Sequence, residues 1–450
     1  MVWSLRLATF AVAILPGAAQ IDCTQSTLTL TAPAQASSAI SSCGTPVNGV
    51  TTLKNSLSIN FTAVAPKVSF DPIDTIDGDI YINVYRYTYF CEGEPATCPN
   101  HPTKESVIAA APNFSSSTLR NITGRIRVEC IAHQIPAAPI PIGLPSRRLK
   151  RQETVTTADP ITFDFPKLEI MDNLYATGPL DGIYANLGPS YNPVNIDATR
   201  VSDLKVDMVN SSGLYFYDNL PPRGGKASII STATEINSTI EMWNNTGLGT
   251  ISLPKLGYTR MFSIHDNPDL ETLESSVTSM QYMNLTKNGP KTALFLDQLH
   301  TIGEGQREWW PYKSNHGSYL TGLAAINLPA LKKTIGPTSD LRFTSNSIPD
   351  LQLSMLNSVN GSFIIEDNES LFDIGLARLQ TIHADLTVSG NPRLLNFTAN
   401  VLKTAASIFM AGDFTNVEFF SLESESVNFE LSGAPSMDCS WFDDHFLARS

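Results

Sequence analysis

The chain has 450 residues, and 30 Lys or Arg stand against 43 Asp or Glu, so its formal net charge at pH 7 is −13. This acidic balance argues against nucleic acid or an anionic membrane surface as a partner, because both attract basic proteins. At this length the chain can form two or three domains or one long repeat array.

Residues 1–19 are typical of a secretory signal peptide, with Arg6, the apolar run Leu7–Leu15 and the small residues Gly17–Ala19. The apolar run is too short to span a bilayer, and the rest of the sequence contains no apolar run that is long enough. We therefore expect a secreted protein.

Cysteines and glycan acceptors both fit export. Six cysteines follow the signal, and in an exported protein they are expected to form disulfides. Ten Asn-x-Ser/Thr sequons mark possible acceptors for N-glycans. We expect glycans at nine of them: Asn60, Asn113, Asn121, Asn210, Asn237, Asn244, Asn284, Asn360 and Asn396.

Residues 20–130 are predicted to form an N-terminal cap and the first coils of a repeat array. The exposed end of such an array needs a polar cover, and a loop closed by a Cys23–Cys43 disulfide would supply one. The sequence leaves the pairing of the other cysteines open: Cys91, Cys98, Cys130 and Cys439.

Residues 131–161 are rich in proline and contain the basic run Arg147–Arg151, so we expect an extruded insert or linker. The Lys150-Arg151 pair can be read as a processing site or as part of a solvated basic loop, and the second interpretation is favoured. Residues 162–440 are predicted to form the main solenoid, with an insertion near 288–318, and residues 441–450 form a C-terminal remnant.

The main solenoid is recognised by its period. Asn368, Asn391 and Asp413 recur at steps of 23 and 22 residues. Apolar residues at alternate positions precede them, such as Phe363 and Ile365, and a short strand points both to one face. Repeats of this length are typical of solenoids, so we predict a mainly β, right-handed β-solenoid with a period of about 22–23 residues and few short helices.

Two further positions of the repeat have a physical interpretation. Gly361, like Ala384 and Ala406, precedes the strand where the entering chain packs too tightly for a large side chain. The recurring Asn is expected to adopt the left-handed conformation at a corner and to bond backbone inside the coil. Asn368 is itself a sequon in this slot, so we predict that it carries no glycan, whereas Asn237 and Asn360 point outward.

No catalytic, metal or cofactor site is predicted. The run Asp71, Asp74, Asp77 and Asp79 offers carboxylates that suit Ca²⁺, but its spacing does not match a calcium loop, so turn chemistry is the favoured interpretation. Solenoids also support pectin-degrading enzymes. The paired carboxylates and ordered Asn-Thr-Asp, Asp-Asp and Gly-His-Gly series of that class are not found, so we expect a protein that is not an enzyme.

Aromatic residues in the predicted insertion are the candidate recognition residues. Trp309, Trp310 and Tyr312 stand beside charged groups and could stack on a sugar ring. Alternatively, the loop folds back and buries them against the flank of the solenoid, and this packing interpretation is favoured.

A series of short motifs spans most of residues 20–443: the Cys23…Cys43 opening, Ile122-Thr-Gly124, Leu253-Pro-Lys-Leu256, Leu328-Pro-Ala-Leu331, Asn267-Pro-Asp-Leu270, Asn391-Pro-Arg-Leu394 and the ending Asp438-Cys439-Ser-Trp441-Phe-Asp443. With these motifs the chain as a whole resembles the fungal cell-wall organisation proteins, the GPI-anchored sporulation-specific/extracellular-mutant family. Its template V/I-x-G-x-Φ-x-Φ-x-x-N resembles receptor L-domain repeats.

The resemblance implies a non-enzymatic glycoprotein of the cell surface and wall that contributes to wall organisation and integrity, with wall polysaccharide or wall proteins as partners. An alternative is a polysaccharide-binding or receptor-like recognition module, and a third interpretation is a β-helix enzyme active on polysaccharides. The family continues into a Ser-rich stalk and a GPI tail, whereas this sequence stops at Ser450. Membrane attachment is therefore expected only through a GPI anchor that this sequence does not encode.

Overall fold

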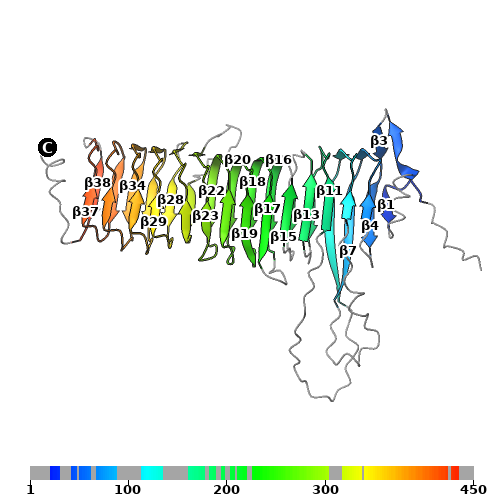
Figure 1. Cartoon of the computed structure of the whole chain (residues 1–450), viewed down its shortest axis with the longest axis horizontal. Helices are drawn as coiled ribbons and strands as arrows, with labels where there is room; N and C mark the ends of the chain where they lie inside the picture. Colours follow the sequence, from blue (N-terminus) through cyan, green and yellow to red (C-terminus); the bar gives the residue numbers. More distant parts are fainter. Residues whose placement is uncertain are drawn as a thin grey trace, which may run out of the picture.

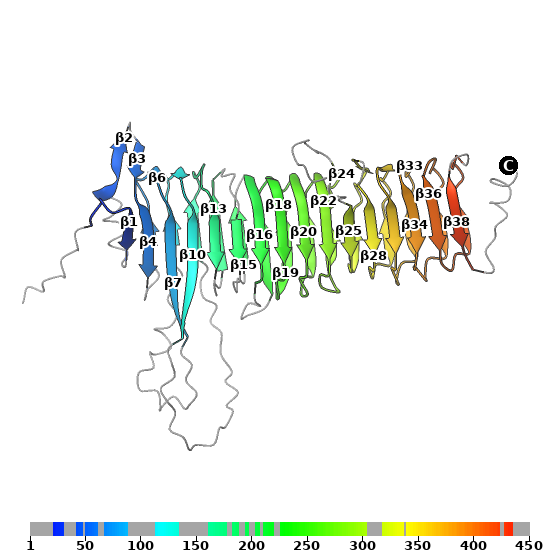
Figure 2. The ribbon, with the colours of Figure 1, turned by 180° about the vertical axis from the view of Figure 1, so that it is seen from behind.

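The computed structural model shows one β-solenoid, in which parallel strands stack along a single long axis (Figures 1 and 2). All its named elements are strands, and Ser42 and Cys43 are the helical positions among the described residues. The described residues are 21–30, 42–47, 50–61, 67–88, 113–134, 161–177, 182–188, 194–197, 203–207, 210–219, 226–303, 317–336, 339–423 and 427–434.

The main wall of the solenoid is a parallel sheet that runs from the first coil to the last. Its strands, in spatial order, are β1 (Thr27–Leu30), β4 (Ser56–Phe61), β7 (Ile80–Thr88), β10 (Ile126–Gln134), β12 (Leu174–Thr177), β14 (Val194–Asp197), β16 (Asn210–Tyr217), β18 (Glu235–Trp243), β20 (Tyr258–His265), β22 (Ser279–Thr286), β25 (Ser318–Thr321), β28 (Leu341–Thr344), β31 (Phe363–Glu366), β34 (Asp385–Ser389), β36 (Ser407–Ala411) and β38 (Asn428–Ser432).

A second wall lies on the opposite side of the core. It consists of a 10-stranded parallel sheet followed by two strand pairs: β5 (Lys67–Ser69), β8 (Asn113–Ser115), β11 (Ile161–Phe165), β13 (Gly182–Leu187), β15 (Asp203–Asp207), β17 (Ala227–Ser231), β19 (Leu248–Leu253), β21 (Thr272–Ser275), β23 (Ala293–Phe295) and β26 (Ala325–Asn327), then β29 (Asp350–Gln352) with β32 (Asp373–Gly375), and β35 (Asn396–Thr398) with β37 (Asn416–Glu418).

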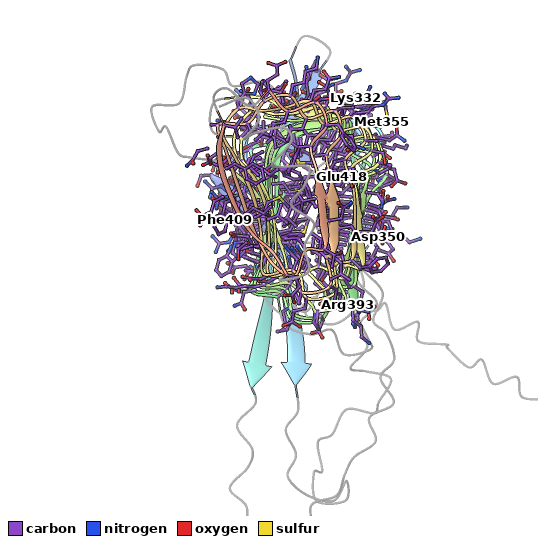
Figure 3. The ribbon with its side chains drawn as sticks, turned by 90° about the vertical axis from the view of Figure 1, so that its left-hand side faces the viewer. Lys332, Asp350, Met355, Arg393, Phe409 and Glu418 are labelled. Carbon is purple, nitrogen blue, oxygen red and sulfur yellow. A yellow bond between two sulfur atoms is a disulfide. The ribbon has the colours of Figure 1, made fainter. Side chains whose placement is uncertain are left out.

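A narrow third wall closes each coil. The long strand β22 pairs at its start with a third-wall strand and at its end with a main-wall strand, so the later part of the third wall shares one 20-stranded sheet with the main wall. The first four strands of the third wall form a separate 4-stranded sheet. The separate strands of this wall are β2 (Thr45–Val47), β3 (Val50–Leu53), β6 (Thr75–Ile76), β9 (Asn121–Ile122), β24 (Thr301–Ile302), β27 (Lys333–Thr334), β30 (Ser358–Val359) and β33 (Thr381–Ile382). Seen along the axis, Phe409 and Glu418 lie on opposite walls, while Lys332 lies beside the third wall (Figure 3).

One coil shows why the sequence folds in this way. Phe363 and Ile365 on β31 are fully buried and pair in register with Leu386 and Val388 on β34. The alternation of apolar residues therefore points one face of every main-wall strand into the core. A single coil cannot bury this face alone, whereas a stack buries a continuous core. The predicted β-solenoid and its period are confirmed.

The N-terminal end carries the disulfide that the sequence analysis proposed. Cys23 and Cys43 are bonded, with Cα atoms 5.3 Å apart, and Cys43 is buried. Asn55 in the next coil donates a hydrogen bond from Nδ2 to the Cys23 carbonyl oxygen (3.2 Å). The disulfide therefore lies against the first coils of the stack.

Several predicted segments lie partly or wholly outside the described residues: 1–19, most of 131–161, 304–316 and 441–450. Of the insertion expected near 288–318, the residues up to Gly303 instead form a regular coil that contains β23 and β24. Within the described ranges the chain forms no helix of the length and apolarity that a bilayer crossing requires.

Candidate recognition surface on the main wall

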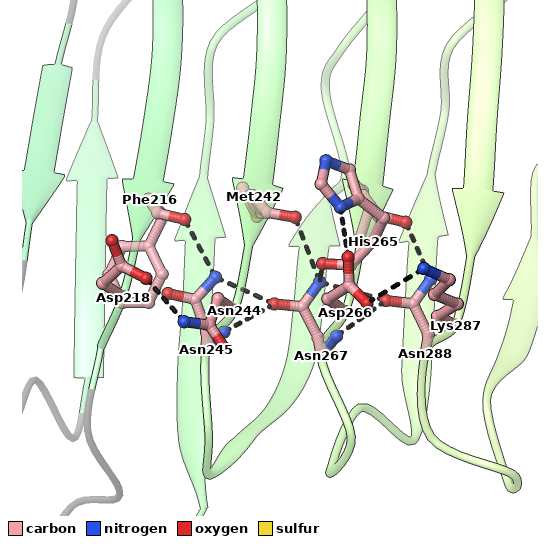
Figure 4. Close-up of polar contacts among 11 residues, drawn as sticks. Phe216, Asp218, Met242, Asn244, Asn245, His265, Asp266, Asn267, Lys287 and Asn288 are labelled. Atoms are coloured by element: carbon pink, nitrogen blue, oxygen red, sulfur yellow. Dashed lines mark hydrogen bonds and ion pairs between the residues drawn. The ribbon is translucent and has the colours of Figure 1, made fainter.

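An asparagine ladder runs along the corner where the main wall ends. In each of its pairs, Oδ1 of one Asn accepts the backbone N–H and a side-chain N–H of the Asn in the preceding coil. For Asn245 these bonds to Asn267 measure 3.1 and 2.8 Å. Its Nδ2 also donates to the Phe216 carbonyl oxygen at 2.8 Å (Figure 4). The same pattern links two runs: Asn219, Asn245, Asn267 and Asn288, then Asn346, Asn368 and Asn391.

The left-handed residue of each corner is the one before the ladder Asn, not the Asn itself. Asp218, Asn244, Asp266 and Lys287 have φ values of 50–55° and directly precede the first run. The left-handed conformation predicted for the ladder Asn is therefore wrong by one position. The Asn contributes its amide instead, because only a buried side chain can bond the coils on both sides.

The ladder is also shorter and less regular than expected. Asp413 was predicted to continue it, but its side chain is exposed and Phe414 points into the core instead. Leu323 takes the ladder position between Asn288 and Asn346. Its backbone N–H still donates to Asn346 Oδ1 at 2.8 Å, but its side chain offers no amide to the preceding coil.

Three aromatic side chains, here called the ring row, stand on the outer face two residues before consecutive ladder Asn. Tyr217, Trp243 and His265 are register partners on β16, β18 and β20. The ring centroids of Tyr217 and Trp243 are 5.4 Å apart. Those of Trp243 and His265 are 6.4 Å apart, with only 6° between the ring planes. All three side chains are partly exposed, so the ring row is a continuous aromatic surface along the solenoid axis.

Polar groups border the ring row on both sides. At the corner, Asn244 Nδ2 donates to Asp218 Oδ1 at 2.6 Å, and His265 Nδ1 lies 2.8 Å from Asp266 Oδ2 (Figure 4). On the wall itself, the Tyr217 hydroxyl donates to Glu241 Oε2 at 3.0 Å. Three carboxylates therefore border the ring row. Two of them orient a ring: Glu241 bonds Tyr217, and Asp266 bonds His265.

The aromatic surface of the main wall continues beyond the ring row. Tyr282 on β22 lies near Tyr319 on β25. The pKa of Tyr282 is raised, mainly because its hydroxyl is buried and to a smaller extent because of the electrostatic effect of Tyr319. The Arg342 guanidinium lies 5.3 Å from the centre of the Tyr319 ring and donates to Asp340 Oδ2 at 2.8 Å. This second cluster thus combines rings with a paired charge.

The candidate residues Trp309, Trp310 and Tyr312 lie outside the described residues. The described chain on either side of them ends at Gly303, after the third-wall strand β24, and resumes at Gly317, before the main-wall strand β25. Sequence reasoning missed the ring row, although a signal was present. Tyr217, Trp243 and His265 each follow an inward apolar residue, so a period of two already places them on the outer face.

The aspartates weighed as a calcium site hold neighbouring coils together instead. Asp71 accepts bonds from the Ser116 hydroxyl (2.7 Å) and the Ser117 backbone N–H (2.8 Å). Asp79 accepts bonds from the Arg125 backbone N–H (2.9 Å) and the Tyr81 hydroxyl (2.7 Å). Across the part of the chain that the structure describes, no group of three or more His, Cys, Asp or Glu is placed to hold a metal ion.

The sequons differ in accessibility. Asn237, Asn244 and Asn396 are exposed, whereas Asn368 is completely buried in the ladder. Partly exposed acceptors are Asn60, Asn113, Asn121, Asn284 and Asn360. The side chain of Asn210 is not among those that the structure describes.

Comparison with known proteins shows distant similarity. The chain is 25% identical over 193 residues to sporulation-specific protein 22 of Saccharomyces cerevisiae. The match covers 42% of this chain and 38% of that protein, so it spans well under half of the relative's length. No known protein-family profile and no solved structure matches the chain. The similarity points to a fungal protein, while the GPI anchor and the receptor L-domain likeness stay predictions.

Proposed function

We propose that this chain is a non-enzymatic, secreted glycoprotein of the fungal cell surface that contributes to the organisation and integrity of the cell wall. The observation that carries the proposal is the continuous stack of coils, which presents long outer walls over the described residues. The signal-like residues 1–19, the exposed sequons and the similarity to a yeast sporulation-specific protein support the same function.

The outward carboxylates of the main wall support a non-catalytic role. A glycosidase of the common type needs one carboxyl group to donate a proton and a second carboxylate to act as base or nucleophile. Glu241 instead accepts a hydrogen bond from the Tyr217 hydroxyl, and Asp340 accepts one from the Arg342 guanidinium. Asp340 Oδ1 also accepts the backbone N–H of Ser362 at 2.8 Å. Each of these carboxylates orients a neighbour, which is a structural task.

We place the protein at the cell surface or in the wall, on the outer face of the plasma membrane if a GPI anchor is present. Its proposed partners are wall polysaccharide or wall proteins. The test is deletion of the gene in the source fungus, followed by surface labelling of the tagged protein and by growth in wall-perturbing dyes. The expected result is surface labelling, with increased dye sensitivity that the intact gene restores. Intracellular labelling, or a deletion strain with normal walls, would contradict the proposal.

A second candidate function is recognition of polysaccharide, and the ring row is the observation that favours it. A glycan array probed with the purified chain separates this function from a purely structural one. Release of reducing sugar from wall polysaccharide would instead support the third interpretation, an enzyme.

A further inference from the structure

We propose that the ring row of Tyr217, Trp243 and His265 binds a linear, neutral, β-linked polysaccharide that lies along the solenoid axis, with one sugar unit on each coil. This proposal rests on the proposed function, because it names the class of wall polymer that the main wall would hold.

The repeat distance of the coils matches that of an extended sugar chain. Adjacent strands of a sheet are about 4.8 Å apart, which is close to the length of one sugar unit in an extended pyranose chain. The three rings occupy equivalent positions on consecutive strands, with neighbouring centroids 5.4 and 6.4 Å apart. A polymer that advances by one unit per coil therefore meets one ring per unit.

A second feature is the chemistry of the surface. Aromatic side chains combine an apolar face, which suits the C–H side of a pyranose ring, with a small loss of conformational freedom on binding. Neighbouring contacts further restrict these rings, because Tyr217 donates to Glu241 and His265 is paired with Asp266. Asp218, Glu241 and Asp266 place carboxylate oxygens beside the rings, where they can accept hydrogen bonds from sugar hydroxyls.

A third feature is charge, which selects neutral over anionic polymers. Three carboxylates border the rings, whereas the Lys287 side chain is 78% exposed and its Nζ lies 4.0 Å from Asp266 Oδ1. A polymer carrying carboxylate or phosphate groups would be repelled by the carboxylates, and the exposed lysine compensates little because solvent screens it. The expected ligand is therefore an uncharged chain.

The test measures binding of neutral oligosaccharides to the purified, glycosylated full chain. The probes are cello-oligosaccharides and N-acetylchito-oligosaccharides of two to six units, with oligogalacturonate as the anionic comparison. The affinity for at least one neutral series is expected to rise up to three or four units and then to level off, because the ring row covers three coils. Oligogalacturonate is expected to bind more weakly than the neutral series.

Variants locate the site. Trp243→Ala is expected to weaken binding roughly tenfold or more, as removal of a central aromatic contact does at other recognition surfaces. Trp243→Phe keeps a ring and is expected to retain most of the affinity. Phe295→Ala is the matched control, because Phe295 is 38% exposed on the second wall and its removal is expected to leave binding unchanged. Thermal melting checks that each variant is folded.

Several outcomes overturn the proposal: no binding of either neutral series, no dependence on length, oligogalacturonate bound as tightly as the neutral series, or a folded Trp243→Ala protein that binds like the parent. Binding that appears only in Asn244→Gln also overturns it, because the ring row would then be covered by the chain's own glycan.

These failures are distinct from failure of the proposed function. A deletion strain with defective walls and a parent chain without oligosaccharide binding would refute the site alone, whereas binding without any wall defect would refute the wall function alone.

Discussion

Oδ1 of Asn391 accepts two hydrogen bonds from Asn368, one from its backbone N–H and one from its Nδ2, both at 3.0 Å. The other hydrogen on Nδ2 is donated to the Phe343 carbonyl oxygen, also at 3.0 Å. Asn368 is thus a glycan acceptor by sequence whose amide is completely engaged inside the core.

We predict that Asn368 carries no glycan in the folded protein, whereas Asn237 and Asn360 do. A sugar on Nδ2 would replace a bonded hydrogen and would need space that the buried corner does not have. Asn237 is exposed and Asn360 partly exposed. Intact-glycopeptide mass spectrometry of the secreted chain measures the occupancy, and high occupancy at Asn368 would contradict the corner assignment.

Removal of one ladder amide is predicted to cost several kcal/mol. Asn267→Ala leaves the buried N–H groups of Asn245 and the Met242 carbonyl oxygen without partners, and each unsatisfied group costs about 1–3 kcal/mol. We expect the free energy of unfolding to fall by roughly 4 kcal/mol in denaturant titration. Asn327→Ala is the control, because Asn327 donates to Asp297 in an exposed pair and should change stability by less than about 0.5 kcal/mol. Equal effects of the two substitutions would refute the role of the ladder.

Close packing between coils predicts a strong effect at Gly361. A Cβ at this position would lie 2.7 Å from the Asp340 backbone nitrogen and 2.8 Å from the Ser339 carbonyl carbon, so Gly361→Ala should destabilise by about 1–3 kcal/mol. Gly257→Ala is the matched control, because the nearest atom to its Cβ would be the Thr234 carbonyl oxygen at 3.4 Å. The control is expected to be neutral or slightly stabilising, since alanine restricts the unfolded chain. Thermal melting of both variants decides the matter.

The contribution of Asp71 to stability is predicted to depend on pH. Partial burial acts to raise its pKa, but hydrogen bonds from Ser116, Thr118 and Ser117 outweigh burial and lower the pKa below the ordinary value of 3.8. A carboxylate with a lowered pKa stabilises the fold above its unfolded pKa, and this stability is lost as the pH falls through the folded pKa. The stability difference between the parent and Asp71→Asn should therefore be constant from neutral pH to about 5 and shrink below about 4. A difference that grows on acidification would contradict this sign.

The Cys23–Cys43 disulfide is predicted to stabilise the N-terminal coils. It joins residues 20 apart, and closing a loop of this length is worth about 3 kcal/mol in the chain-entropy model. The double substitution Cys23→Ser and Cys43→Ser should therefore lower the stability of the first coils. Relative to the parent, hydrogen exchange should accelerate more in β1 and β4 than in β34. Peptide mapping that finds either cysteine free, or bonded to another cysteine, would show that the pairing is wrong.

The fold was predictable because the period of the solenoid is visible in single residues. Phe363 and Ile365 are two residues apart, as are Leu386 and Val388, and the pair recurs after 23 residues, so a common inward face follows from strand geometry. The corner was less predictable. The amide of Asn368 and the left-handed Asp367 are both plausible turn features, and only the three-dimensional contacts show which residue does which task.

The candidate site was the least predictable part. Trp309 and Trp310 attract attention because they are adjacent in the sequence, whereas Tyr217, Trp243 and His265 are separated by whole coils and become neighbours only when the register is known. The end of the ladder was missed for a related reason. Asp413 fits the spacing, but the larger apolar Phe414 beside it gains more from burial and takes the inward place.

The break in the ladder at Leu323 has a mechanical consequence. The first described coil, with β1, and the last, with β38, lie at opposite ends of one axis (Figure 1), so a pull between them would be carried from coil to coil in series. In such an arrangement the weakest interface sets the force at which the whole stack gives way. Leu323 cannot donate a side-chain amide to the coil of Asn288, so this interface lacks a bond that the neighbouring ladder interfaces possess. Within the ladder, tension is therefore expected to part the stack at this point before it separates coils that two ladder Asn join.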